Sequence, residues 1–211
     1  MTADPAVATR QPVGLSPRWR FRSGTAPAFG AGGGGPRVLV AFASRHGATR
    51  EIAAALARWL PECQDGQRAG VSAVLAPVER GPDPAAFDAV VLGSALYAGE
   101  WLKPARRYVG AVASELRARP TWLFSSGLAG GSTALLQDGD DARWIGDSIG
   151  ALAHRVFPGR VERRVLSAAE QHAWPAGPGV AGDFRDWPAV RAWAGEIATQ
   201  LAARQAAPMA G

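Results

Sequence analysis

One short loop near the start of the predicted domain gathers side chains suited to binding an anion. Residues 44–49 read SRHGAT and stand directly before a helical pattern. A helix start offers unpaired backbone N–H groups and a partial positive charge. The glycine lets the backbone approach a ligand, while the hydroxyls add donors and the basic side chains add positive charge. Together they favour a phosphate dianion as ligand. The residues concerned are Ser44, Arg45, His46, Gly47 and Thr49.

The loop lacks the motifs of three other phosphate-handling folds. The pattern GxxxxGK[ST] does not occur in the chain, which argues against a P-loop triphosphatase. GxGxxG is absent from this turn, which argues against a Rossmann dinucleotide site. No pair of carboxylates follows the first predicted strand, which argues against a magnesium-dependent phosphoacceptor domain. A monophosphate held without a metal is the ligand that the loop suits.

The elements around this loop alternate between strand and helix patterns. Residues 37–43 (RVLVAFA) form a continuous apolar run, typical of a strand buried on both faces. Residues 49–60 repeat apolar side chains at helical spacing. Further strands are predicted at 71–77, 87–94, 120–127 and 159–166. One further helix is predicted after Pro104, and a second carries an apolar stripe of Ile145, Ile149, Leu152 and Val156. The last helix is predicted from Asp186 onward, with an inner face of Val190, Trp193, Ile197 and Leu201.

This alternation predicts an α/β fold with an open parallel sheet covered on both faces. In such a sheet, ligands lie outside the carboxyl ends of the strands, where the strand order reverses. We therefore expect the loops after the first, third and fourth strands to form the site.

The segment AFASRHGATREIAAALA resembles the phosphate-binding signature of flavodoxins, and the similarity covers most of residues 37–205. The resemblance implies a flavodoxin-like fold: a doubly wound five-stranded parallel sheet in three α/β/α layers, with FMN as cofactor. It assigns the phosphate to Ser44, Arg45, His46, Gly47, Ala48 and Thr49. It assigns the isoalloxazine ring to a first loop, SALYAGEW, with Ser94, Ala95, Leu96, Tyr97, Ala98, Gly99 and Trp101, and to a second loop, SSGLAGG, with Ser125, Ser126 and Gly127.

The two expected flavin loops differ in aromatic content. A flavin ring is flat and largely apolar, so it favours an aromatic face, which Tyr97 and Trp101 can supply. Flavodoxins commonly sandwich the ring between aromatic side chains from two loops, whereas SSGLAGG has none. One ring face is then more open. That arrangement suits direct contact with a substrate, and it equally fits weak or lost FMN binding.

Composition indicates one globular domain. The chain has 211 residues, of which 47% are hydrophobic, enough for a core of normal size. No apolar run reaches the roughly 18 residues needed to cross a bilayer. The lone Cys63 rules out a disulfide framework, and the spacing of the histidines forms no metal-ligand cluster. Because no secretory signal pattern is present, a cytoplasmic location is expected.

The first 36 residues differ in composition from the rest. They are rich in proline, glycine and arginine, so a disordered tail is expected there, with a domain over 37–205 and a disordered end over 206–211. The patch RWRFR (18–22) can touch an anionic membrane surface peripherally, although a solvated extension is the simpler interpretation.

Most of the net charge lies in that tail. Four arginines and one aspartate put +3 of the net +5 in residues 1–36, so the predicted domain is only slightly basic. This balance argues against a basic groove for nucleic acid. It also argues against an electron-shuttling flavodoxin, because shuttles are typically strongly acidic.

Within the flavodoxin-like proteins, the chain is most similar to menaquinone-dependent protoporphyrinogen oxidases. The similar segments are VLVAFASRHGATREIA and DAVVLGSALYAGEWLKPARRYV. This resemblance implies an FMN-dependent oxidoreductase that oxidises protoporphyrinogen IX, with a quinone as redox partner. The alternatives are a one-electron carrier with a redox protein partner and a non-enzymatic binding domain that has lost FMN. The sequence assigns no catalytic residue and no metal site, and it leaves the oligomeric state open.

Several other residues have structural interpretations. His154 is expected near the end of a helix, where it caps carbonyls or faces water. Trp59, Trp144 and Trp193 stand at helical positions and are expected to pack against the domain. The segment GDFRDWP (182–188) is similar to a tail motif in some flavodoxin-domain homologues, and its expected role is to cap the last helix.

Overall fold

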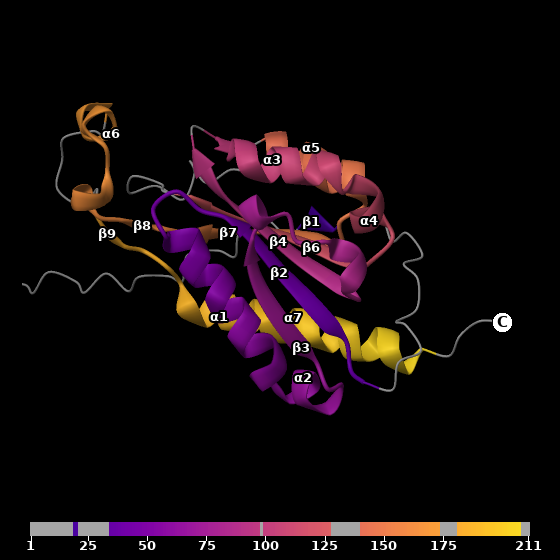
Figure 1. Cartoon of the computed structure of the whole chain (residues 1–211). Helices are drawn as coiled ribbons and strands as arrows, with labels where there is room; N and C mark the ends of the chain where they lie inside the picture. The colour runs from indigo at the N-terminus through magenta and orange to yellow at the C-terminus, as the bar shows by residue number, and fades with distance from the viewer. Residues whose placement is uncertain (1–18, 21–33, 98, 128–139, 174–180, 208–211) are drawn as a thin grey trace, which may run out of the picture.

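The computed structural model describes residues 19–20, 34–97, 99–127, 140–173 and 181–207. Within these residues a central sheet lies between two layers of helices (Figure 1). The expected three-layer α/β/α fold with a doubly wound parallel sheet is therefore confirmed.

Five parallel strands in the described residues form the body of the sheet, in the order β3-β2-β4-β6-β7. Two short strands pair antiparallel to this body, one with β7 and one with β4. Because β2 pairs with β3 on one side and β4 on the other, the strand order reverses at β2. The strands are β1 (Trp19–Arg20), β2 (Arg37–Ala43), β3 (Ser72–Pro77), β4 (Ala89–Tyr97), β5 (Glu100–Trp101), β6 (Thr121–Gly127) and β7 (Ala153–Pro158).

The helices divide between the two faces of the sheet, and each face has its own buried cluster. The apolar runs of the inner strands are buried on both faces, as their composition predicts. One face is covered by α1 (Ala48–Glu62), α2 (Gln64–Arg68) and α7 (Trp187–Ala206), and the other by α3 (Lys103–Ala111), α4 (Ala113–Arg117) and α5 (Asp140–Ile149).

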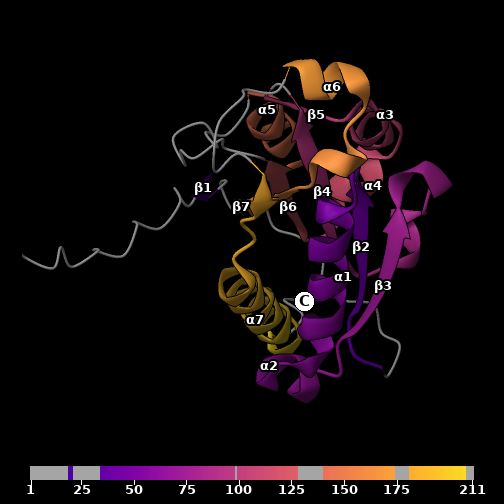
Figure 2. The same ribbon diagram turned by 90° about the vertical axis from the view of Figure 1, so that its left-hand side faces the viewer.

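A small ribbon lies beside the N-terminal end of α1 (Figures 1 and 2). It consists of β8 (Arg160–Val161) and β9 (Gly182–Asp183), which pair antiparallel. The chain between them includes the short helix α6 (Ala168–Ala173). Three single turns of 3-10 helix complete the described elements: η1 (Val78–Arg80), η2 (Pro84–Ala86) and η4 (Arg163–Val165).

The fifth parallel strand is not where the sequence pattern placed it. The predicted strand at 159–166 is wrong, because β7 at Ala153–Pro158 pairs with β6 instead. The predicted helix over Ile145, Ile149, Leu152 and Val156 is wrong in its second half, because Val156 belongs to β7. Helix α5 ends at Ile149, and Gly150 follows with a φ of 64°, a left-handed conformation that ends helices.

Two further observations bear on the sequence predictions. Trp144 was expected to pack, but its side chain on α5 is 69% exposed, so that prediction is wrong. Trp19–Arg20, from the segment for which disorder is expected, pairs with Ala153 and His154 of β7.

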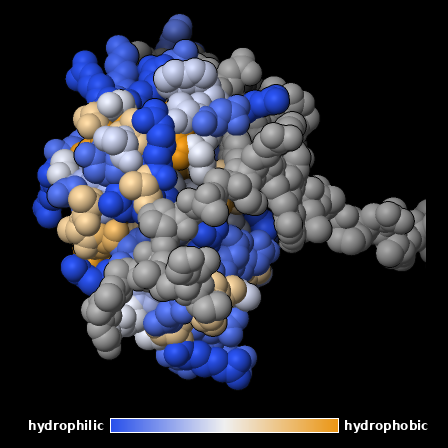
Figure 3. All heavy atoms as spheres, turned by 90° about the vertical axis from the view of Figure 1, so that its right-hand side faces the viewer, coloured by the Kyte–Doolittle hydropathy of each residue, from blue (hydrophilic) through white to orange (hydrophobic). Residues whose placement is uncertain are grey.

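The described surface is mixed in polarity. On the face shown in Figure 3, apolar side chains lie in small patches between polar and charged ones. Among the helices of the described residues, none combines the length and apolar character that a membrane crossing requires.

Candidate functional site

The loop after β2 is built around a glycine in a left-handed conformation. Gly47 has a φ of 88° and is the N-cap of α1. Glycine adopts this conformation without the steric penalty that a Cβ brings. Its amide donates a hydrogen bond to Ser44 Oγ at 3.1 Å, and its carbonyl accepts the first intrahelical bond from Glu51 N at 3.0 Å. The amides of residues 48–50 precede that first bond and belong to the open end of the helix.

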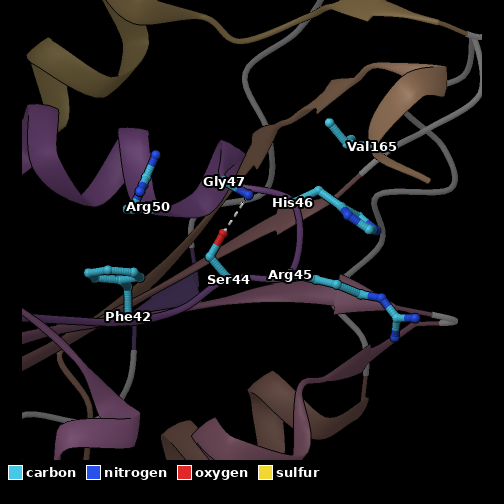
Figure 4. Close-up of a pocket in the computed structure, with 7 residues that line it drawn as sticks. All are labelled: Phe42, Ser44, Arg45, His46, Gly47, Arg50 and Val165. Carbon is cyan, nitrogen blue, oxygen red and sulfur yellow. Dashed lines mark hydrogen bonds between the residues drawn. The ribbon is translucent and has the colours of Figure 1, made fainter. Parts of the chain in front are cut away.

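A cavity of about 430 Å³ opens at this loop (Figure 4). Its walls combine one aromatic ring, one hydroxyl, three basic side chains and one aliphatic side chain. The helix end and the basic side chains give it positive character, which suits an anion. The lining residues are Phe42, Ser44, Arg45, His46, Gly47, Arg50 and Val165.

Four of the six predicted phosphate residues therefore line one cavity. The other two, Ala48 and Thr49, form the first turn of α1, where Thr49 is 2% exposed. Arg50 and Val165 are not among the predicted phosphate residues. Arg50 adjoins the motif and is exposed, so its charge next to the loop was a usable signal. Val165 comes from η4, far along the chain, and no local pattern indicated it.

The first predicted flavin loop is a hairpin. Strand β4 continues to Tyr97, which pairs with Glu100 of β5, and Gly99 has a φ of 82° at the turn. Ala98 lies outside the described residues. Tyr97 is 48% exposed, and the Arg45 guanidinium carbon lies 4.7 Å from the centroid of its ring. The predicted phosphate loop and the first predicted flavin loop thus meet at a contact between Arg45 and Tyr97.

Trp101 does not offer an exposed ring face. Its side chain is 1% exposed, and its Nε1 donates to Ser125 Oγ at 2.8 Å. Ser125 Oγ also lies 2.8 Å from His154 Nε2. The backbone N–H of Trp101 donates to Asp141 Oδ2 at 3.1 Å. The tryptophan therefore anchors the hairpin to β6 and α5, in place of the ring contact expected for it.

His154 does not lie where the helical pattern placed it. It lies in β7 and is 3% exposed, so the prediction of a helix end facing water is wrong. The cause is the misplaced helix boundary, because a residue taken as helical belongs to a buried strand. Its ring joins the buried chain of hydrogen bonds through Ser125.

The remaining predicted flavin residues in the described part of the chain are mostly buried or half-buried at the ends of β4 and β6. Ser94 Oγ donates to Ala95 O at 2.9 Å and accepts from Leu102 N at 3.0 Å. Ala95 and Leu96 are half-buried. Ser126 is 3% exposed, and Gly127 O accepts from Gly159 N at 2.8 Å. The rest of the second loop, 128–131, lies outside the described residues.

A second charged group surrounds Glu51, in the first turn of α1. The carboxylate of Glu51 accepts from Arg160 at 2.8 Å and from Arg185 at 2.5 Å. Arg185 also binds both carboxylate oxygens of Asp183. Hydrogen bonds from Arg185 lower the pKa of both carboxyls, Glu51 and Asp183, and these partners raise the pKa of Arg185.

The sequence matches a known family over most of its folded part. Residues 39–173 match the family model described as "Flavodoxin domain". The chain belongs to the flavodoxin domain family. This flavodoxin-domain protein has no match among the curated proteins.

Solved structures resemble this flavodoxin-domain protein in fold. A flavodoxin from the domain Archaea is 11% identical, with a TM-score of 0.51, over 78% of this chain and 98% of that one. Flavodoxin 1 from Bacillus cereus is 14% identical, with a TM-score of 0.52, over 77% and 97%. The rubredoxin oxygen:oxidoreductase from Desulfovibrio gigas is 16% identical, with a TM-score of 0.51, over 82% of this chain but only 38% of its own length.

The described residues hold no group of three or more His, Cys, Asp or Glu side chains placed to bind a metal ion. Within the described residues, the positive cavity at 44–47 and the contact between Arg45 and Tyr97 beside it make up the candidate site.

Proposed function

We propose that this chain binds FMN, with the phosphate at the loop 44–49, and acts as an FMN-dependent oxidoreductase. The observation that carries the proposal is the cavity at the open end of α1, because it combines backbone amides with basic side chains. Membership of the flavodoxin domain family supports it, as does the similarity in fold to a flavodoxin and to an oxidoreductase.

The residues at this cavity fit the phosphate end of FMN. A phosphate dianion needs several donors and positive charge, and the loop supplies both without a metal. Ser44 and the amides of residues 48–50 are the donors that the loop would offer, and Arg45 and Arg50 would supply charge. The exposed ring of Tyr97, beside Arg45, can supply a face for the isoalloxazine ring.

In this proposal the chain's own residues bind and orient the cofactor. FMN, when bound, supplies the hydride and electron chemistry. The left-handed Gly47 would let the backbone of the loop approach the phosphate, while the buried anchor of Trp101 holds the hairpin that carries Tyr97. These two elements would hold the two ends of FMN.

Flavin retention is the direct test. Protein purified in the presence of FMN and passed through gel filtration should keep the absorbance of bound flavin. Titration of the apoprotein should show tighter binding of FMN than of riboflavin, because only FMN carries the phosphate. A colourless protein that binds neither FMN nor riboflavin would favour the non-enzymatic alternative and overturn the proposal.

As the finer form of this proposal, protoporphyrinogen IX is the substrate and a quinone is the acceptor. Each cycle would move two electrons and two protons from the substrate to the quinone. The second predicted flavin loop, SSGLAGG, has no aromatic side chain, and a flavin face left open in this way suits contact with a large apolar substrate.

Anaerobic mixing distinguishes this substrate from the carrier alternative. Reduction of the bound flavin by protoporphyrinogen, followed by reoxidation with a soluble menaquinone analogue, is the expected result. Flavin that protoporphyrinogen leaves oxidised would exclude this substrate. Flavin that exchanges electrons only with a reductase protein would favour the one-electron carrier.

A further inference from the structure

A carboxylate stands close to the proposed phosphate site. Glu51 lies in the first turn of α1, and its Oε1 is 3.9 Å from the point where a Cβ on Gly47 would lie. A carboxylate here favours helix formation, because it faces the positive end of the helix. It also opposes a bound phosphate, because both groups are negative and both are attracted by the same amides.

Two arginines from distant parts of the chain hold that carboxylate. Arg160 of β8 donates to Oε1, and Arg185, just after β9, donates to Oε2. The side chain of Glu51 is 35% exposed, so without these partners it has room to move. Its two oxygens are instead both engaged on the side of the β8–β9 ribbon.

Arg185 is the better-defined of the two arginines. Its side chain is 5% exposed, against 26% for that of Arg160. Asp183 binds it through both carboxylate oxygens, and its guanidinium carbon lies 4.5 Å from the centroid of the Trp187 ring. A planar guanidinium stacked on one side and held by a bidentate carboxylate has little freedom.

We infer that Arg185 is a positioning residue for the phosphate loop, acting through Glu51. It holds the Glu51 carboxylate away from the amides at the start of α1 and neutralises its charge, so that these amides stay available to a phosphate. The segment GDFRDWP thereby has a second role besides the helix cap that Asp186 provides. The inference rests on the proposed FMN function.

Matched binding of FMN and riboflavin tests this role. Arg185→Met keeps much of the apolar stem and removes the charge. It should weaken FMN binding about tenfold and leave riboflavin binding within about twofold, because only FMN carries the anion that Glu51 opposes. Flavin fluorescence during titration of the apoprotein gives both dissociation constants.

Glu51→Gln tests whether Arg185 acts through Glu51. In the double variant with Arg185→Met, FMN affinity should return to within about twofold of that of Glu51→Gln alone. Failure of this restoration would overturn the inference and assign Arg185 a direct attraction for the phosphate. An equal loss of FMN and riboflavin binding would also overturn it, since a structural role affects both.

Arg191→Met is the matched control. Arg191 lies on α7 with its guanidinium carbon 5.8 Å from the centroid of the Trp59 ring, so the change removes a similar contact away from Glu51. It should leave both affinities unchanged. If Arg185→Met does not fold, Asp183→Asn loosens the same arginine more gently, and about a threefold loss for FMN alone is expected. Wild-type protein that binds neither flavin would refute the proposed function itself, a result distinct from those above.

Discussion

The loop after β2 and the hairpin after β4 leave neighbouring parallel strands at the same edge of the sheet. In the loop, the basic side chains of Arg45 and Arg50 remain exposed, and one hydroxyl, that of Ser44, supports the turn. Behind the hairpin, polar groups are buried and bonded to one another, as in the pair Trp101 of β5 and Ser125 of β6.

The two regions suit different roles: the loop is suited to binding a ligand, and the buried residues behind the hairpin are suited to supporting the site. A region whose donors face a cavity can change its ligand without unfolding, because its polar groups are already solvated. A region whose donors are buried and paired cannot lose one partner cheaply. We therefore expect substitutions in the loop to act on affinity and substitutions behind the hairpin to act on stability.

The largest expected effect is on FMN affinity, through Gly47→Asp. The new carboxylate would stand against the phosphate in a backbone conformation with a φ of 88°, so a loss of at least about 100-fold is expected. Gly150→Asp is the matched control, since Gly150, after α5, has a φ of 64° with nothing within 4 Å of its Cβ position. Titration with FMN measures both variants, and similar losses in the two would refute the site assignment.

Ser125→Ala should lower the free energy of unfolding. It leaves Trp101 Nε1 and the His154 ring without their shared partner in a buried place, at a cost of about 2–4 kcal/mol. Urea denaturation measures the change. The exposed Ser114→Ala, on α4, should cost less than about 0.5 kcal/mol. A stability loss no larger than that of the control would show that the buried chain of hydrogen bonds does not hold the hairpin.

Tyr97→Ala should weaken FMN and riboflavin alike. The lost contact is with the ring system that both flavins share, so a loss of about tenfold for each is expected. Trp144→Ala removes an aromatic ring that is 69% exposed on α5 and should change neither affinity. If Tyr97→Ala affects FMN alone, the tyrosine acts at the phosphate end through Arg45 and not at the ring.

The smallest expected effect is a pH dependence of stability from the Glu51 network. The pKa of Glu51 is lowered in the folded state from an ordinary 4.5, so its contribution is complete above that value and is lost as pH falls through the folded pKa. The pKa of Asp183 is also lowered in the folded state, so its contribution to stability is lost at low pH in the same way. Both carboxylates are partly exposed, so the contribution is under about 1 kcal/mol. Thermal unfolding of wild type and Arg185→Met at about pH 6 and about pH 3.5 should show a smaller acid loss in the variant, and an equal loss would contradict this.

Local sequence patterns were enough for most elements of the fold. The apolar run at 37–43 and the helical spacing at 49–60 match β2 and α1, and Asp186 caps α7 as expected. The pattern failed over 150–166, because apolar residues there fit a helix stripe and a strand equally well. Pairing with β6 decided between them.

By itself, the sequence determined the sheet's buried strands and the glycine-containing turn that opens α1, because apolar runs, helical spacing and turn residues act over a few neighbours. Only the tertiary structure decided that Arg185 would meet Glu51, 134 positions away, and that Trp101 would be buried against Ser125. Such contacts depend on strand order and register, which bring distant segments together and leave no local signal in either one.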